Sequence, residues 1–246
     1  MNALRPKILT ILLLLLNPLM GFSFHFERWE NNLEFGGSFV TGNSPATTVT
    51  GRFASDLDNE YEVQPWGYSF IMSGKRATAQ DVETARQATS SLQLQYLFNQ
   101  KWYVYGRGSL GYNAFETYDH TARDSAGLGY VIVKNDVHFW TLEAGPGGMH
   151  QRVAGTKEWQ NQLIGHSETR YLRHLNSKTD IAQLVQVDSG RLNTHIRSES
   201  SLLTNLYAAI ALKIGIEVSH YTTIPEGSRN TKKTDTSTTI GVRYKF

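Results

Sequence analysis

The chain has no cysteine, and this absence excludes both a disulfide framework and a lipid anchor attached through cysteine. Beyond its N-terminal segment it also lacks any apolar run near the eighteen or so residues of a membrane-spanning helix. Charge of one sign is not in excess either, since 24 Lys and Arg residues face 22 Asp and Glu residues. A nucleic-acid partner, which needs a clustered basic face, is therefore not expected.

The N-terminal segment has the parts of a secretory signal peptide. Arg5 and Lys7 precede a run at residues 8–16 that is almost entirely Leu and Ile, and small residues follow it at the usual cleavage position. The run is too short to cross a membrane as a helix. We therefore expect a signal peptide over residues 1–23 and a single mature domain over residues 24–246.

The mature part alternates apolar and polar residues with a period of two and shows no long helical period. Near its end, Ile240, Val242 and Tyr244 share one face of a strand, whereas Arg243 and Lys245 share the other. Segments of about ten to fifteen residues suit tilted strands that cross a membrane. We predict twelve strands, at residues 29–41, 46–58, 64–76, 87–98, 101–114, 119–133, 136–152, 162–175, 178–188, 192–204, 206–221 and 231–246.

Short and longer connections alternate between these strands. The short ones lie at residues 99–100, 134–136, 176–177 and 204–205, and the longer polar ones at 76–84, 115–120, 152–160 and 222–230. In outer-membrane barrels, short periplasmic turns alternate in this way with longer extracellular loops. An even number of strands also brings both ends of the domain to the periplasmic side. The sequence therefore predicts an all-β fold, an antiparallel up-and-down transmembrane β-barrel of about 12 strands in a bacterial outer membrane.

Four of the five tryptophans share one position in this scheme. Trp29, Trp66, Trp102 and Trp140 each lie near the periplasmic start of a rising strand. Indole side chains are enriched where a membrane meets water, and outer-membrane barrels carry such rings of aromatic residues. We predict that these four residues form a periplasmic aromatic girdle.

The last predicted strand has the pattern of the closing strand that the insertion machinery of outer-membrane barrels reads. Its signal residues are Ile240, Val242, Tyr244 and Phe246. We accordingly expect the barrel-assembly machinery and outer-membrane lipids, with lipopolysaccharide, as partners, and a monomer as the assembly state. Charged segments at residues 76–86 and 229–233 are expected to be outer loops, either solvated or in contact with lipopolysaccharide phosphates through Lys and Arg.

Several segments resemble one known family in sequence and in order. They are LEFGGSFVTGNSPATTVTG at 33–51, YGRGSLGYNAFETYDHTARDSAGLGY at 105–130, LEAGPGG at 142–148, RSESSL at 197–202 and KKTDTSTTIGVRYKF at 232–246. The family is the domain-of-unknown-function 481 family, described as salt-induced outer-membrane proteins. The resemblance implies an outer-membrane barrel and supplies no catalytic motif or ligand.

The polar faces of the strands concentrate charge in the predicted lumen. The cations are Arg52, Lys75, Arg107, Arg170, Arg197, Lys213, Arg243 and Lys245, and the anions are Glu34, Glu143, Glu168, Glu199 and Glu217. Charges away from bulk water are stable mainly when they are paired and hydrogen-bonded. We expect an interlocked polar core that fills the lumen of a structural or envelope-homeostasis protein. The alternative is a narrow channel whose excess of cations favours small anions, because twelve strands lie between the filled and the open sizes of barrel.

An enzyme would need a nucleophile and a base within hydrogen-bonding reach of each other. His195 and Ser198 are close in sequence, but no acidic residue is placed beside His195 by sequence, and His220 lies near the barrel rim. We therefore expect no enzyme, cofactor or metal site, and keep a surface lipid-modifying hydrolase as the third alternative. The sequence leaves the orientation of the strand at 181–188 open, and it predicts a kink or bulge at Gly145-Pro146-Gly147-Gly148.

Overall fold

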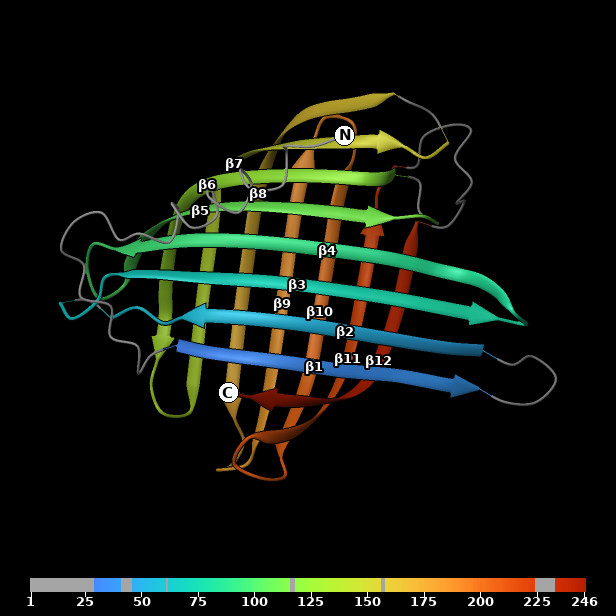
Figure 1. Ribbon diagram of the computed structural model, residues 1–246. Coiled ribbons are helices and arrows are strands. Elements are labelled where there is room, and N and C mark those ends of the chain that lie inside the picture. The colour runs from blue at the N-terminus through green and yellow to red at the C-terminus, as the bar shows by residue number, and fades with distance from the viewer. Residues whose placement is uncertain (1–28, 41–45, 61, 116–117, 156–157, 224–232) are drawn as a thin grey trace, which may run out of the picture.

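In the computed structural model the chain forms a closed antiparallel β-barrel (Figure 1). The structure describes residues 29–40, 46–60, 62–115, 118–155, 158–223 and 233–246. Its twelve strands pair in chain order, and β12 pairs with β1 to close the sheet. They are β1 Trp29–Val40, β2 Ala46–Leu57, β3 Trp66–Ala79, β4 Val82–Leu97, β5 Trp102–Asn113, β6 Tyr118–Lys134, β7 His138–Val153, β8 Trp159–His174, β9 Thr179–Gly190, β10 Thr194–Asn205, β11 Ile210–Tyr221 and β12 Thr234–Lys245. The predicted twelve-stranded, all-β, up-and-down barrel is confirmed.

Three predicted features lie outside the described residues. They are the signal peptide at residues 1–23, the connection at 42–45 between the first two predicted strands, and most of the outer loop at 229–233. Within the described part of the chain, no helix has the length and apolarity needed to cross a membrane.

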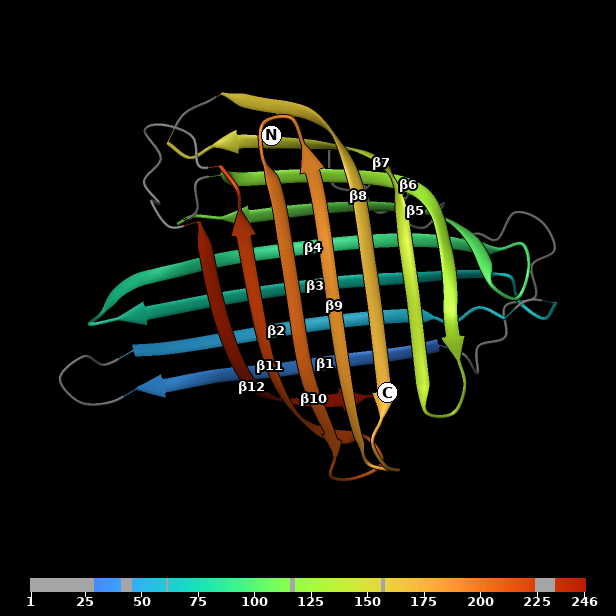
Figure 2. The same cartoon turned by 180° about the vertical axis from the view of Figure 1, so that it is seen from behind.

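The barrel consists of two walls whose strands cross at a steep angle (Figures 1 and 2). Strands β1 to β5 run along one wall and β9 to β12 along the other, while β6 to β8 curve between them. Crossed packing of this kind lets the inner faces of sheets that are far apart in sequence approach each other. Side chains from non-neighbouring strands can therefore meet across the interior.

The predicted outer loop at residues 76–84 is wrong, because β3 and β4 continue into a tight hairpin there. The turn residues Gln80 and Asp81 have φ values of 51° and 62°. Positive φ at both central residues is typical of a type I′ hairpin turn, which usually contains Asn or Gly. Gln80-Asp81 lacks that signal, so the turn was not recognised.

The charged residues near this turn face one another across the hairpin. Arg76 Nε donates to Glu83 Oε1 over 2.9 Å, and Arg86 Nε donates to the same oxygen over 3.1 Å. Both arginines are largely exposed, so they pair within the strands rather than in a loop.

The alternation of connection lengths is also only partly as predicted. The connection between β9 and β10 is short, at residues 191–193, although it lies on the expected outer side. The connection between β2 and β3, at residues 58–65, is longer than expected and contains a bridge between Glu60 and Gln64. The length of a connection thus predicts the side of the barrel on which it lies less well than the order of the strands does.

Strand faces agree with the predicted alternation. On β11, Leu212 and Ile214 are 37% and 38% exposed on the outer wall, whereas Lys213 between them points into the barrel and is bonded there. The structure also orients β9, which the sequence left open. Asp188 is fully buried in the interior, and Ile181 on the opposite face is 39% exposed.

A pair of glycines brings β6 and β7 unusually close at the predicted Gly-Pro-Gly-Gly irregularity. A Cβ atom on Gly127 would lie 2.1 Å from the Ala144 carbonyl oxygen, and one on Gly145 would lie 2.1 Å from the Ala126 carbonyl oxygen. No side chain fits at either position. The register of the β6–β7 ladder shifts elsewhere, in β6 near Tyr118 and near Val131.

The outward face of β11 gives a direct test of the lipid-facing wall. Leu212→Arg should lower the free energy of unfolding in lipid by about 2–4 kcal/mol, because a guanidinium near the middle of the bilayer is poorly solvated. Urea titration of the protein refolded in vesicles measures the loss. Tyr207→Arg, in the exposed turn before β11, is the matched control and should be close to neutral. Equal stability of both variants would contradict the assignment of this face.

Candidate functional site: the charged lumen

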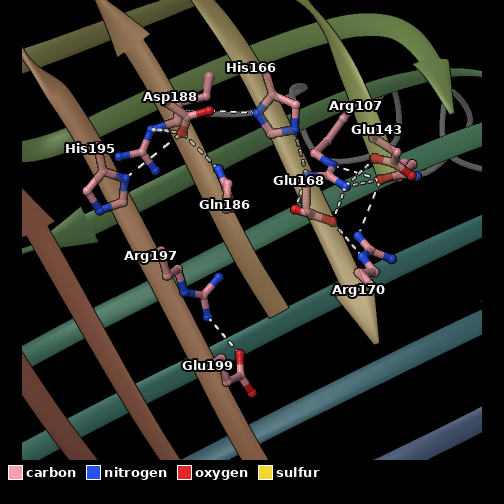
Figure 3. A network of polar contacts seen from close by, with 12 residues as sticks. Arg107, Glu143, His166, Glu168, Arg170, Gln186, Asp188, His195, Arg197 and Glu199 are labelled. Atoms are coloured by element: carbon pink, nitrogen blue, oxygen red, sulfur yellow. Dashed lines mark hydrogen bonds and ion pairs between the residues drawn. The ribbon is translucent and has the colours of Figure 1, made fainter. Parts of the chain in front are cut away.

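Two glutamates face each other directly inside the barrel. Glu143 of β7 and Glu168 of β8 are Cα partners, and their side chains are 4% and 2% exposed. Like charges opposite each other repel, and burial removes the water that would screen them. Arg107 of β5 bonds to both carboxylates (Figure 3), with Nη2 3.0 Å from Glu143 Oε2 and 2.8 Å from Glu168 Oε1.

Further donors complete this group, which we call the Arg107 cluster (Gln93, Tyr103, Arg107, Glu143, Glu168 and Arg170). Gln93 Nε2 and the Tyr103 hydroxyl donate to Glu143 Oε1 over 2.8 Å and 2.9 Å. Arg107 Nε donates to Gln93 Oε1 over 2.7 Å, and Arg170 Nε donates to Glu168 Oε1 over 2.5 Å. Each buried carboxylate therefore has both a charged and a further partner, which is the condition for burying charge without a large penalty.

A second group lines the opposite part of the interior. We call it the Glu34–Glu199 cluster (Glu34, Arg52, Arg197, Glu199, Lys213, Glu217 and Arg243). Glu199 and Glu217 are Cα partners on β10 and β11, and Arg197 Nη2 lies 3.1 Å and 2.8 Å from their carboxylates. One arginine between two facing glutamates thus occurs in both clusters.

The remaining members of this cluster link the strands on either side of the β1–β12 boundary, where the barrel closes. Glu34 of β1 accepts from Lys213 Nζ over 2.9 Å and lies 2.7 Å from Arg243 Nη2. Arg52 Nη1 donates to Glu199 Oε1 over 3.4 Å. The facing glutamates of this cluster are more exposed than those of the first, because Glu199 and Glu217 are 21% and 37% exposed whereas Glu143 and Glu168 are 4% and 2% exposed.

Two predicted lumen cations belong to neither cluster. Lys75 Nζ donates to Ser237 Oγ over 2.8 Å. Lys245 Nζ bonds to Glu30 over 2.5 Å, and both of these side chains are more than half exposed, which places the pair at the rim.

A row of polar side chains crosses four adjacent strands toward the end of the barrel opposite the tryptophans Trp29, Trp66, Trp102 and Trp140. His166, Asp188, His195 and Tyr221 are successive cross-strand partners on β8, β9, β10 and β11. His166 Nδ1 is 2.6 Å from Asp188 Oδ1, and Arg123 Nε is 3.7 Å from Asp188 Oδ2 (Figure 3). Within the described residues no group of three His, Cys, Asp or Glu side chains is arranged to hold a metal ion.

Sequence reasoning missed several of these residues. Gln93 and Tyr103 are neutral, so a count of charges passes over them, and Asp188 lies on the strand whose orientation was left open. A signal for Asp188 does exist in the sequence. Gln186 and Asp188 share a face by their spacing of two, and Gln186 Nε2 donates to Asp188 Oδ2 over 2.8 Å.

The four predicted girdle tryptophans lie at one end of the barrel. Trp29, Trp66, Trp102 and Trp140 are 39–44% exposed on the outer wall. Each has a tyrosine ring beside it, with ring centroids between 4.6 and 6.1 Å apart: Trp29 with Tyr68, Trp66 with Tyr96, Trp102 with Tyr130, and Trp140 with Tyr171. The result is a belt of alternating indole and phenol groups, which suits an interface between lipid and water.

The residues of the predicted assembly signal all point outward from β12. Ile240, Val242, Tyr244 and Phe246 are 47–56% exposed. Tyr244 and Phe246 stack with ring centroids 5.7 Å apart. Phe246 also takes part in closure, because its backbone N–H donates to the Asn31 carbonyl over 3.0 Å.

The Arg107 cluster predicts a large effect of a single substitution. Arg107→Met keeps much of the side-chain volume but leaves two facing buried carboxylates without their shared cation. We expect the free energy of unfolding to fall by about 3–5 kcal/mol, measured by urea titration in detergent or vesicles. Arg86→Met, which breaks an exposed arginine–glutamate pair on the outer wall, is the control and should cost about 0–1 kcal/mol. A similar loss of unfolding free energy in the two variants would show that the Arg107 cluster stabilises the barrel no more than an exposed ion pair does.

Comparison with known proteins agrees with this architecture. A search of curated proteins finds no match. Among solved structures, the NanC porin matches with 12% identity, a TM-score of 0.51 and coverage of 88% of this chain and 100% of that chain. The translocator domain of autotransporter NalP from Neisseria meningitidis matches with 12% identity, a TM-score of 0.47 and coverage of 98% and 94%. The COG4313 outer-membrane channel from Pseudomonas putida F1 matches with 10% identity, a TM-score of 0.49 and coverage of 88% and 94%. A family profile matches residues 33–246, and the chain belongs to that family, described as "Protein of unknown function, DUF481".

Proposed function

We propose that this protein is an outer-membrane barrel with a side-chain-filled lumen, and that it serves the structure or the osmotic and stress homeostasis of the envelope. The observation that carries the proposal is the Arg107 cluster. Its two carboxylates and Arg107 are buried and paired with one another, and only Arg170, at 36% exposed, keeps much contact with solvent. A pore for solutes needs charges that face water along its path.

The bonds of this cluster cross the interior instead of following the wall. Arg107 joins β5 to β8, and Gln93 joins β4 to β7, and in each case two other strands lie between the pair. Arg170 of β8 also reaches Gln93 of β4 over 3.5 Å. Bonds of this kind narrow the lumen and hold β4 and β5 of one wall to β7 and β8, which curve between the two walls.

A narrow, anion-preferring channel is the second candidate, and the Glu34–Glu199 cluster favours it. Arg52, Arg197 and Arg243 keep 27–36% of their side-chain surface exposed although each has an acidic partner. A water path along this half would therefore meet guanidinium groups first. Small anions would be the favoured solutes.

The proposal includes a position in the membrane. The belt of tryptophan and tyrosine would lie at the periplasmic interface, and the mouth that contains Asp188 would open outward. A cleaved segment at residues 1–23 would direct export, the barrel-assembly machinery would insert the chain, and the folded protein would be a monomer in contact with lipids and lipopolysaccharide. The outward arginines Arg76 and Arg86, on the outer hairpin, are suited to lipopolysaccharide phosphates.

Single-channel recording in planar bilayers separates the two candidates. The refolded wild-type protein should show no steady conductance, whereas the double variant Arg107→Ala/Glu168→Ala, which removes a cross-brace with no net change of charge, should open one. Heat-modifiable migration on gels verifies that both proteins are folded. Steady anion-selective openings of the wild type, reduced by Arg243→Gln, would replace the filled-lumen proposal with the channel.

The role of the closing strand is tested by Phe246→Ala. This change keeps the backbone bonds to Asn31 but removes the aromatic group, so insertion by the assembly machinery should slow several-fold while the folded barrel remains stable. Pulse-chase measurement of the heat-modifiable form gives the rate. Phe115→Ala, which removes an exposed aromatic group elsewhere, should insert at the normal rate. Normal insertion of both variants would argue against the predicted signal.

A further inference from the structure

A serine, a histidine and a carboxylate converge on three neighbouring strands near the outer mouth. His195 Nε2 of β10 lies 2.9 Å from Ser219 Oγ of β11. On its other side, His195 Nδ1 lies 3.9 Å from Asp188 Oδ2 of β9. The register explains the arrangement, because Asp188 is the Cα partner of His195 and Ser219 is its diagonal neighbour.

The two ring nitrogens of His195 face the groups that a hydrolytic triad requires. In such triads Nε2 takes the proton of the serine hydroxyl and Nδ1–H points at the carboxylate. Among the described residues, His195 Nδ1 is buried and has no hydrogen-bond partner. A shift of about 1 Å toward Asp188 would give it one, and such bonds are often long before substrate binds.

The histidine is held in place by its surroundings. The ring is 5% exposed and stacks on Tyr221, with centroids 4.5 Å apart and an angle of 28° between the planes. Asp188 is fixed in turn by His166 and Gln186. Base and acid are thus preorganised, while the nucleophile side chain is only partly buried.

We propose that Ser219, His195 and Asp188 form a hydrolytic site for small, water-soluble carboxylic esters. Ser219 shares the inward face of β11 with Lys213 and Glu217, so a substrate would reach it from inside the barrel and not from the bilayer. Two arginines belong to the surroundings of the site: Arg197 is the Cα partner of Ser219, and Arg123 Nη2 lies 3.5 Å from the Tyr221 hydroxyl. We assign stabilisation of the developing oxyanion to these cations.

The reaction balances with these groups and water alone. Ser219 Oγ bonds to the carbonyl carbon as its proton passes to His195 Nε2, and collapse of the tetrahedral adduct breaks the ester C–O bond. The leaving alkoxide takes the proton from Nε2. Water then attacks the acyl-serine and gives a proton to Nε2, and the carboxylic acid leaves as Ser219 recovers that proton. Asp188 is a positioning residue that orients the imidazole.

The site does not depend on whether the lumen conducts, since substrate and products can use the same mouth. A competing explanation is that Asp188 only anchors the polar row through His166. The two explanations differ in one property. A structural serine is inert, whereas a serine with a positioned base is a nucleophile.

The test is covalent labelling of the refolded full-length protein with a fluorophosphonate probe, followed by peptide mass mapping. We expect one label, on Ser219. Ser198→Ala is the matched control, because Ser198 lies on the other face of β10 and accepts a hydrogen bond from Gln183 over 3.0 Å. The Ser198→Ala protein should be labelled on Ser219 to the same extent as the wild type. Labelling of His195→Gln should fall at least about 100-fold. No label on folded wild-type protein, or equal labelling of His195→Gln, would overturn the proposal.

Ester turnover and rescue complete the test. Hydrolysis of p-nitrophenyl butyrate should fall about 100-fold or more in Ser219→Ala, a small change that leaves folding intact even if His195→Gln does not fold. Asp188→Asn should lose labelling, and Asp188→Glu, whose longer side chain spans the 3.9 Å gap, should regain most of it. Turnover that is equal in wild type and Ser219→Ala, or release of fatty acid from phospholipid vesicles in place of the soluble ester, would refute the assigned site.

Discussion

Closure of the sheet is the constraint on which the rest of this structure depends. A strand in lipid has no water for its backbone groups, so each strand needs two neighbours, and β12 must return to β1. Once the sheet is closed, the alternation of side chains divides the residues between two environments. Apolar and aromatic groups such as Leu212 and Trp102 lie on the outer wall, and the two charged clusters lie in the interior.

Charge confined in this way has to be neutralised locally, and the barrel does so with a repeated arrangement. Glutamates that face each other across a ladder are joined by one arginine, once by Arg107 from another strand and once by Arg197 from their own sheet region. The two glutamates of the first arrangement are almost fully buried, whereas those of the second are partly exposed. This difference in exposure is the reason why we propose a structural role for the first cluster and place the candidate solute path along the second.

Local patterns made much of this fold predictable. The faces of β11, the four tryptophan positions and the inward direction of Arg107 follow from a period of two, which short-range sequence contains. What could not be predicted depends on pairing at a distance. The ion pair between Arg107 and Glu168 cannot be predicted without knowing which strands meet across the interior. The tight turn at Gln80-Asp81 was not predicted because it contains no glycine, the usual sequence signal of such a turn. Likewise, Ser198 is close to His195 in sequence but lies on the opposite face, whereas Ser219 reaches it through the β10–β11 register.

The ladder between β1 and β12 has a consequence for how the barrel would yield under load. Within the described residues it pairs Asn32 to Gly37 of β1 with β12 and adds two backbone bonds between Asn31 and Phe246, whereas β1 pairs with β2 along its whole length. Lateral pressure in a bilayer acts on every boundary between strands alike. We therefore expect the boundary with the fewest paired residues, between β1 and β12, to separate first. Glu34 of β1 lies at this boundary. It bonds to Arg243 of β12 and to Lys213 of β11 and so holds β1 to both strands. Loss of that one carboxylate would remove the ion pair between Glu34 and Arg243, which joins β1 to β12 across the shortest ladder of the barrel.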